Sequence, residues 1–147
     1  EPSPYHPVAV ALAEAVLRLR EALRRPPEFP GLPPLAEAQV PPEASAAAQM
    51  LRQAYRDPDD QKAVALALRT AVVALPPERW KFKEAALRTM VLKLGADARA
   101  VTGLLLHDLD DCLGLPWHAV ATEIARNEVL GEEVAHVIDE KKRIEQL

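Results

Sequence analysis

Apolar residues recur at every third or fourth position through most of the 147-residue chain, and this spacing constrains the fold more than any other feature. Between residues 7 and 25, the apolar side chains at this spacing are Val8, Leu12, Val16, Leu19 and Leu23. The period matches an α-helical turn, and no stretch alternates apolar and polar residues as a half-buried strand does. We therefore predict an all-α fold, a compact bundle of about six to seven helices in a single domain over residues 1–147.

Prolines, glycines and acidic residues mark where these helices begin and end. Asp57 followed by Pro58 is typical of a helix start, and Gly95 is a residue type favoured directly after a helix. The predicted helices cover residues 7–25, about 40–56, 57–75, 78–94, 97–114, 117–124 and 131–147. Only 4% of the residues are aromatic, so we expect a core of alanine, leucine and valine.

A proline-rich connector separates the first two predicted helices. Residues 26–35 contain five prolines, each of which removes a backbone donor and disfavours the helical conformation of the residue before it. We expect a stiff, extended loop that wraps around the helices. An alternative is that this segment is a polyproline-type ligand for an aromatic-lined groove in a partner.

Charge and composition exclude several function classes. The formal net charge is −4 and no face gathers enough lysine and arginine to follow a phosphate backbone, so no nucleic-acid partner is expected. No apolar run approaches the ~18 residues of a membrane span, and no targeting segment is recognisable, so no membrane association is expected. The single cysteine, Cys112, excludes an internal disulfide and suits a small buried side chain; we expect a cytoplasmic protein.

One segment places the most hydrophobic turn of the chain beside its densest cluster of titratable side chains. Residues 97–114 read DARAVTGLLLHDLDDCLG and are predicted to form one helix of about four turns. Asp108 is expected to point at the apolar stripe of this helix. Asp110 and Asp111 lie near its predicted C-terminus, where acidic side chains oppose the helix macrodipole. Acidic residues placed against the helix dipole, with no evident gain in stability, indicate a functional site.

His107 and Asp108 offer an imidazole nitrogen and a carboxylate, both good ligands for a divalent cation. Adjacent helical residues diverge by about 100°, so they can hold one ion only if other residues complete the shell. The candidates for completing it are Asp111, His118, Glu123 and His136. The structural alternative is that His107 flanks a helix end and that Asp108 pairs with Arg88 or Arg99.

The run GLLLHDLDD, residues 103–111, resembles the central motif of HD-superfamily metal phosphohydrolases, in which an apolar helix delivers a His-Asp pair to a metal ion. It is most similar to the hydrolase domain of the bifunctional ppGpp synthetase/hydrolases. The resemblance covers about residues 84–147. It implies an HD-like C-terminal half, with His107 and Asp108 as ligands of a Mn or Mg ion.

The chain departs from that family at two ligand positions. The place of the family's first ligand His falls near Lys83, a cation, and the family's final ligand Asp is not found. The acidic pair that follows the His-Asp motif sits one residue early, at Asp110 and Asp111.

Two functions of different classes follow from these patterns. The favoured one is a small soluble interaction or regulatory module without a cofactor, a degenerate HD-like domain that binds a protein partner or another copy of itself through apolar helix faces. The alternative is a divalent-metal phosphohydrolase acting on a nucleotide or other phosphoester. In that enzyme His107 and Asp108 hold the ion, and Asp110 or Asp111 orients the attacking water.

Overall fold

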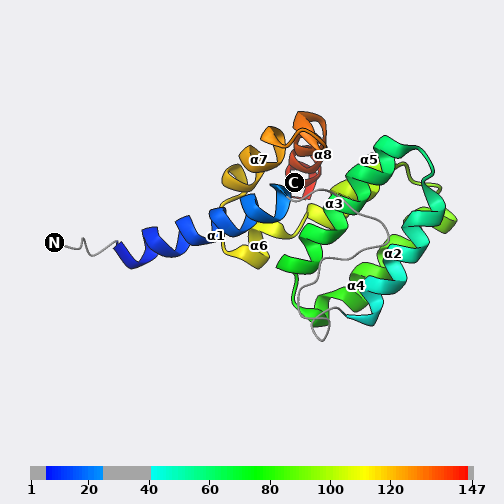
Figure 1. Ribbon diagram of the computed structural model, residues 1–147, viewed down its shortest axis with the longest axis horizontal. Coiled ribbons are helices and arrows are strands. Elements are labelled where there is room, and N and C mark those ends of the chain that lie inside the picture. The colour runs from blue at the N-terminus through cyan, green and yellow to red at the C-terminus, as the bar shows by residue number, and fades with distance from the viewer. Residues whose placement is uncertain (1–5, 25–40, 146–147) are drawn as a thin grey trace.

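Helices and the turns between them make up the part of the chain that the computed structural model describes, residues 6–24 and 41–145, and these ranges contain no strand. The prediction of an all-α fold is therefore confirmed (Figure 1). The elements are α1 (His6–Arg24), α2 (Pro42–Ala54), α3 (Pro58–Ala74), α4 (Pro77–Arg88), the π-helical turn η2 (Thr89–Lys93), α5 (Ala98–Leu106), α6 (Leu109–Leu113), α7 (Trp117–Arg126) and α8 (Gly131–Glu145). The predicted connector, residues 26–35, lies outside the described residues.

Two residues that were predicted to begin and end helices, Asp57 and Gly95, do so in the structure. The carboxylate of Asp57 accepts hydrogen bonds from the backbone N–H groups of Asp59 and Asp60, both at 3.1 Å, and so caps α3. Gly95 has φ +62°, a left-handed conformation that only glycine adopts without strain, and it ends the α4–η2 segment. These boundaries depend on residues that are near one another in sequence.

The predicted helix over residues 97–114 is wrong in one respect, because it is broken in two. Helix α5 ends at Leu106 and α6 begins at Leu109, with Asp108 between them at φ −97°, ψ 6°. The carbonyl of Leu104, which an uninterrupted helix would pair with the Asp108 N–H, accepts a hydrogen bond from Lys83 Nζ at 2.8 Å. A side chain from α4 therefore satisfies a backbone group at the break.

This break changes the position of the two acidic residues that follow it. Asp110 and Asp111 lie in the first turn of α6, where the helix dipole stabilises acidic side chains. The expected conflict with the dipole at the end of a long helix is therefore wrong. The prediction failed because the periodicity of apolar residues continues across the break and gives no sign that the helix is interrupted.

Helix α3 lies at the centre and packs against α1, α2 and α5, while α5 also packs against α8 and α8 against α7. Figure 1 shows α2 and α4 on one side of this centre and the α7–α8 pair on the other. The buried apolar residues are mostly alanine, leucine and valine, as expected from the composition, together with the fully buried Trp80. Among the described helices, none is both long enough and apolar enough to cross a membrane.

Helix α1 is packed along only part of its length. Ala15, Leu19 and Leu23 are buried where α1 lies on α3 and α7. The N-terminal half, residues 6–14, which we call the arm, projects beyond the other helices (Figure 1). Of the apolar residues at helical spacing in α1, Leu19 faces the core as predicted. Leu12, which is 37% exposed, does not.

Candidate functional site

His107 and Asp108 lie together at the α5–α6 break and contact one another. His107 Nδ1 is 3.0 Å from Asp108 Oδ1, and His107 Nε2 is 3.1 Å from Glu145 Oε2 on α8. Ionised carboxylates only accept hydrogen bonds, and a neutral imidazole can donate to only one of the two. The imidazole lies between the break and the end of α8, with one carboxylate oxygen near each ring nitrogen.

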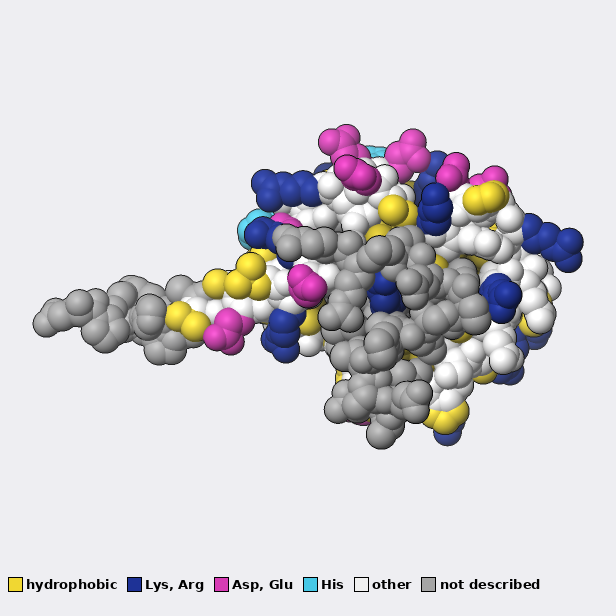
Figure 2. Space-filling view, in the orientation of Figure 1, with side chains coloured by type: hydrophobic (Ala, Val, Ile, Leu, Met, Phe, Trp, Pro, Cys, Tyr) yellow, Lys and Arg dark blue, Asp and Glu magenta, His cyan; other side chains and the backbone are white. Residues whose placement is uncertain are grey.

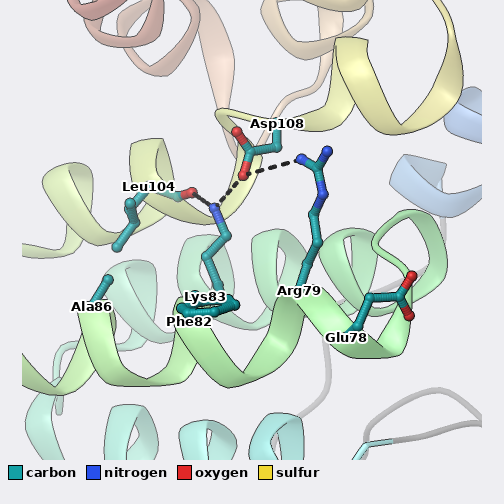
Figure 3. Close-up of a pocket in the computed structure, with 7 residues that line it drawn as sticks. All are labelled: Glu78, Arg79, Phe82, Lys83, Ala86, Leu104 and Asp108. Atoms are coloured by element: carbon teal, nitrogen blue, oxygen red, sulfur yellow. Dashed lines mark hydrogen bonds and ion pairs between the residues drawn. The ribbon is translucent and has the colours of Figure 1, made fainter.

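Lys83 is the second partner of Asp108, and it comes from α4. Its Nζ is 2.9 Å from Asp108 Oδ2 and 2.8 Å from the Leu104 carbonyl, and Lys83 is only 7% exposed (Figure 3). Arg79, one turn earlier on α4, reaches toward the same carboxylate oxygen, at 4.0 Å. The hydrogen bond with His107 and that from Lys83 hold the pKa of Asp108 well below its usual value, although partial burial acts in the opposite direction.

Asp110 and Asp111 do not converge with that pair. Both carboxylate oxygens of Asp110 accept from Lys142 Nζ of α8, at 3.1 and 3.0 Å, and Lys142 lies 5.1 Å from the centre of the Trp117 ring. Asp111 is exposed. In this arrangement Asp110 fastens α6 to α8, and the structure gives neither residue a position facing Asp108.

The predicted additional ligands have other surroundings. Glu123 is bound by Arg20, at 2.8 and 3.1 Å, and His136 Nε2 is 3.3 Å from Glu140 on the same helix. His118 is exposed at the start of α7. Within residues 6–24 and 41–145, no group of three or more His, Cys, Asp or Glu side chains is placed to hold one ion.

The donors that are present do not fit a divalent cation in this arrangement. An ion on Asp108 would meet the Lys83 ammonium, which already occupies one carboxylate oxygen at 2.9 Å. Like charges at such separations repel, so the ion would have to displace the lysine from a largely buried position. The metal site at His107 and Asp108 stays a prediction, and the geometry described here supports no reaction step through it.

The structural alternative named Arg88 or Arg99 as a partner of Asp108, and both arginines pair with other residues. Arg88 pairs with Glu84 one turn before it, and Arg99 pairs with Glu133 of α8 at 2.6 Å. Lys83 was noted only as a cation at a family ligand position, and its contact with Asp108 could not be foreseen because 25 residues separate the two.

A groove opens beside this ion pair, between α4 and α5. It is open to solvent and has a volume of about 490 Å³, and its lining consists of Glu78, Arg79, Phe82, Lys83, Ala86, Leu104 and Asp108 (Figure 3). Phe82 is 78% exposed, which is unusual for a large apolar side chain. The sequence patterns did not predict this groove.

One signal in the sequence was available for the groove. Arg79, Phe82, Lys83 and Ala86 are spaced i, i+3, i+4 and i+7, so they share one face of α4. Trp80 and Leu87, on the side of α4 that faces away from Phe82, are buried, and Lys83 beside them is buried as well. A helix with a phenylalanine on the face opposite its core residues indicates an exposed contact surface.

Cys112 is half-buried, and burial raises the pKa of its thiol, as expected for a packing residue rather than a nucleophile.

Comparisons with protein-family models, with curated proteins and with solved structures found no match for this chain. The resemblance to HD-superfamily phosphohydrolases therefore remains a prediction.

Proposed function

We propose that this chain is a protein-interaction module, and that the groove between α4 and α5 binds an amphipathic helical segment carrying a carboxylate. The observation that carries this proposal is the exposed Phe82 beside the cations Arg79 and Lys83. Helical ligands of this kind lay apolar side chains at i, i+3 and i+7 into a groove. Aromatic and arginine side chains are also those that dominate binding energy at interfaces.

Arg79 is the group in the groove that can pair with an acidic ligand. The groove is lined by two cations, Arg79 and Lys83, and by two carboxylates, Glu78 and Asp108. Lys83 is already paired with Asp108, at 2.9 Å. Arg79 is only loosely engaged, since its guanidinium lies 4.0 Å from Asp108 and its side chain is 45% exposed. A carboxylate on the ligand can therefore take Arg79 as a partner without breaking a close ion pair.

The groove is also preorganised. Lys83 bonds the Leu104 carbonyl and Asp108, and so fixes α4 relative to the α5–α6 break that forms the other wall. Trp80 and Leu87, both fully buried, anchor the side of α4 that faces away from Phe82. A wall that is already ordered loses little conformational entropy when a ligand binds.

The test is binding of a fluorescently labelled synthetic helix that carries leucines at i, i+3 and i+7 and glutamate at i+4, measured by fluorescence anisotropy. We expect Phe82→Ala to weaken binding by about tenfold or more, the loss of one anchor side chain. We expect higher salt to weaken binding as well, because Arg79 is exposed.

The matched control is Leu94→Ala. Leu94 is 73% exposed, close to the value for Phe82, but it does not line the groove. Binding that is equally reduced by both substitutions, or by neither, contradicts the proposed function.

A further inference from the structure

The arm of α1 exposes an apolar surface that nothing in the described chain covers. Val10, Ala11, Leu12, Ala13 and Glu14 are all exposed. Four of these five consecutive residues are apolar, so apolar side chains project from most of the circumference of the helix. A helix of that kind is normally buried. Hydrophobic side chains on the arm are visible between its grey tip and the body in Figure 2.

One face of α1 has the pattern that the groove would accept. Val10, Ala13 and Leu17 are spaced i, i+3 and i+7, and Glu14 lies at i+4 on the same face. We call these four residues the outer stripe. Leu17 is 57% exposed, and the opposite face of the helix is the one buried through Ala15 and Leu19. Glu14 is the only charged residue between positions 10 and 17.

The arm cannot reach the groove of its own chain while α1 stays in place. Leu19 and Leu23 bury the second half of α1 on its neighbours, and Arg20 fastens it to Glu123 of α7 through two hydrogen bonds, at 2.8 and 3.1 Å. The arm continues the same helix away from the other elements (Figure 1). The outer stripe can therefore enter only the groove of another molecule.

We infer that the occupant of the groove is the outer stripe of a second copy of this chain. This inference rests on the proposed function of the groove. The complementarity is one of apolar surface and charge: Val10, Ala13 and Leu17 supply apolar anchors for the surface around Phe82, and the Glu14 carboxylate pairs with the loosely held Arg79. Contact between two different surfaces of identical chains is heterologous, so it leaves a free arm and a free groove and propagates into a chain or a ring.

The test is the molar mass of the protein in solution as a function of concentration, by light scattering after size exclusion. We expect the mass of the unmodified chain to rise above that of the monomer. Leu17→Asp in the outer stripe and Phe82→Asp in the groove each remove one of the two surfaces, and both positions are exposed, so folding is retained. Each variant alone is expected to be a monomer.

The decisive sample is an equimolar mixture of these two variants. Leu17→Asp keeps an intact groove and Phe82→Asp keeps an intact arm, so the mixture is expected to form a complex of twice the monomer mass. Ile144→Asp, at a residue that is 67% exposed on α8 and outside both surfaces, is the matched control and is expected to associate normally. Charge reversal by Glu14→Arg or by Arg79→Glu alone should weaken association, and the double variant should restore it.

Several results would overturn the inference. A monomer at every concentration does so, and it leaves the proposed function to be judged by the binding of the synthetic helix. Association that survives Phe82→Asp but not Leu17→Asp indicates arm-to-arm pairing and also overturns it. Failure of the mixed variants to form a complex has the same consequence.

Discussion

Phe82 in the groove and Val10 in the arm are both exposed apolar side chains, but the helices that carry them are held in different ways. Helix α4 is fixed on the opposite face by Trp80 and on the groove side by Lys83, whereas residues 10–14 of α1 are exposed on every side. Half a helix of this length is marginal in water without tertiary contacts. An exposed apolar residue on a fixed helix indicates a preformed binding surface. An exposed apolar residue on an unsupported helix indicates a segment that a binding partner would stabilise.

The largest expected difference between the two regions is in stability. Leu87→Ala, beneath the groove, should lower the free energy of unfolding by about 2–5 kcal/mol, because the side chain is fully buried and leaves a cavity. Leu12→Ala in the arm should change it by less than about 0.5 kcal/mol, because alanine is an equally good helix former and little packing is lost. Chemical denaturation of the monomeric protein measures both values. Equal losses would show that the arm is as well packed as the frame of the groove.

A smaller effect is expected from the ion pair that fixes the groove. Lys83→Met keeps most of the aliphatic stem but removes the donor to the Leu104 carbonyl and to Asp108. We expect a loss of about 1–3 kcal/mol in the free energy of unfolding, the usual cost of leaving buried polar groups without a partner. Lys81→Met, at an exposed position on the same helix, is the control and should be neutral. A neutral Lys83→Met would mean that the ammonium group does not stabilise the break.

The smallest effect should appear in the dependence of stability on pH. The pKa of Asp108 is lower in the folded protein than its unfolded value of ~3.9, so the stabilisation is complete above about pH 5 and declines as pH falls below that value. We expect about 1 kcal/mol from this carboxylate, reduced by its partial contact with solvent. Asp108→Asn should lower the melting temperature near neutral pH and flatten its acid dependence. The exposed Asp111→Asn is the control, and an unchanged acid profile for Asp108→Asn would contradict the assignment.

The helices themselves could be predicted because their signals are local. Caps such as Asp57 and glycines such as Gly95 act through groups a few residues away, and the spacing of Leu19 and Leu23 places both on one face. The same reasoning failed at residues 97–114, where the apolar period runs across the break. Local patterns indicate which conformation a segment prefers. They do not indicate that a side chain from another helix will bond to its backbone, as Lys83 does at this break.

The candidate site was predictable only as a cluster of residue types. The sequence drew attention to His107 and Asp108, and the two are in contact, but the arginines that it offered Asp108 as alternative partners pair with other residues, and it did not reveal the groove around Phe82. The contact of Asp108 with Lys83 depends on how α4 lies against α5, and no local rule sets that arrangement.

The sequence by itself determined an all-α chain, most of its helix boundaries and a core of small and branched aliphatic residues, because helical hydrogen bonds, caps and apolar periodicity are short-range. Only the tertiary structure decided that α1 extends beyond its support, that the helix breaks at Asp108 and that Lys83 is held inside. Each of these depends on groups from distant parts of the chain, and their energies exist only once the helices have packed.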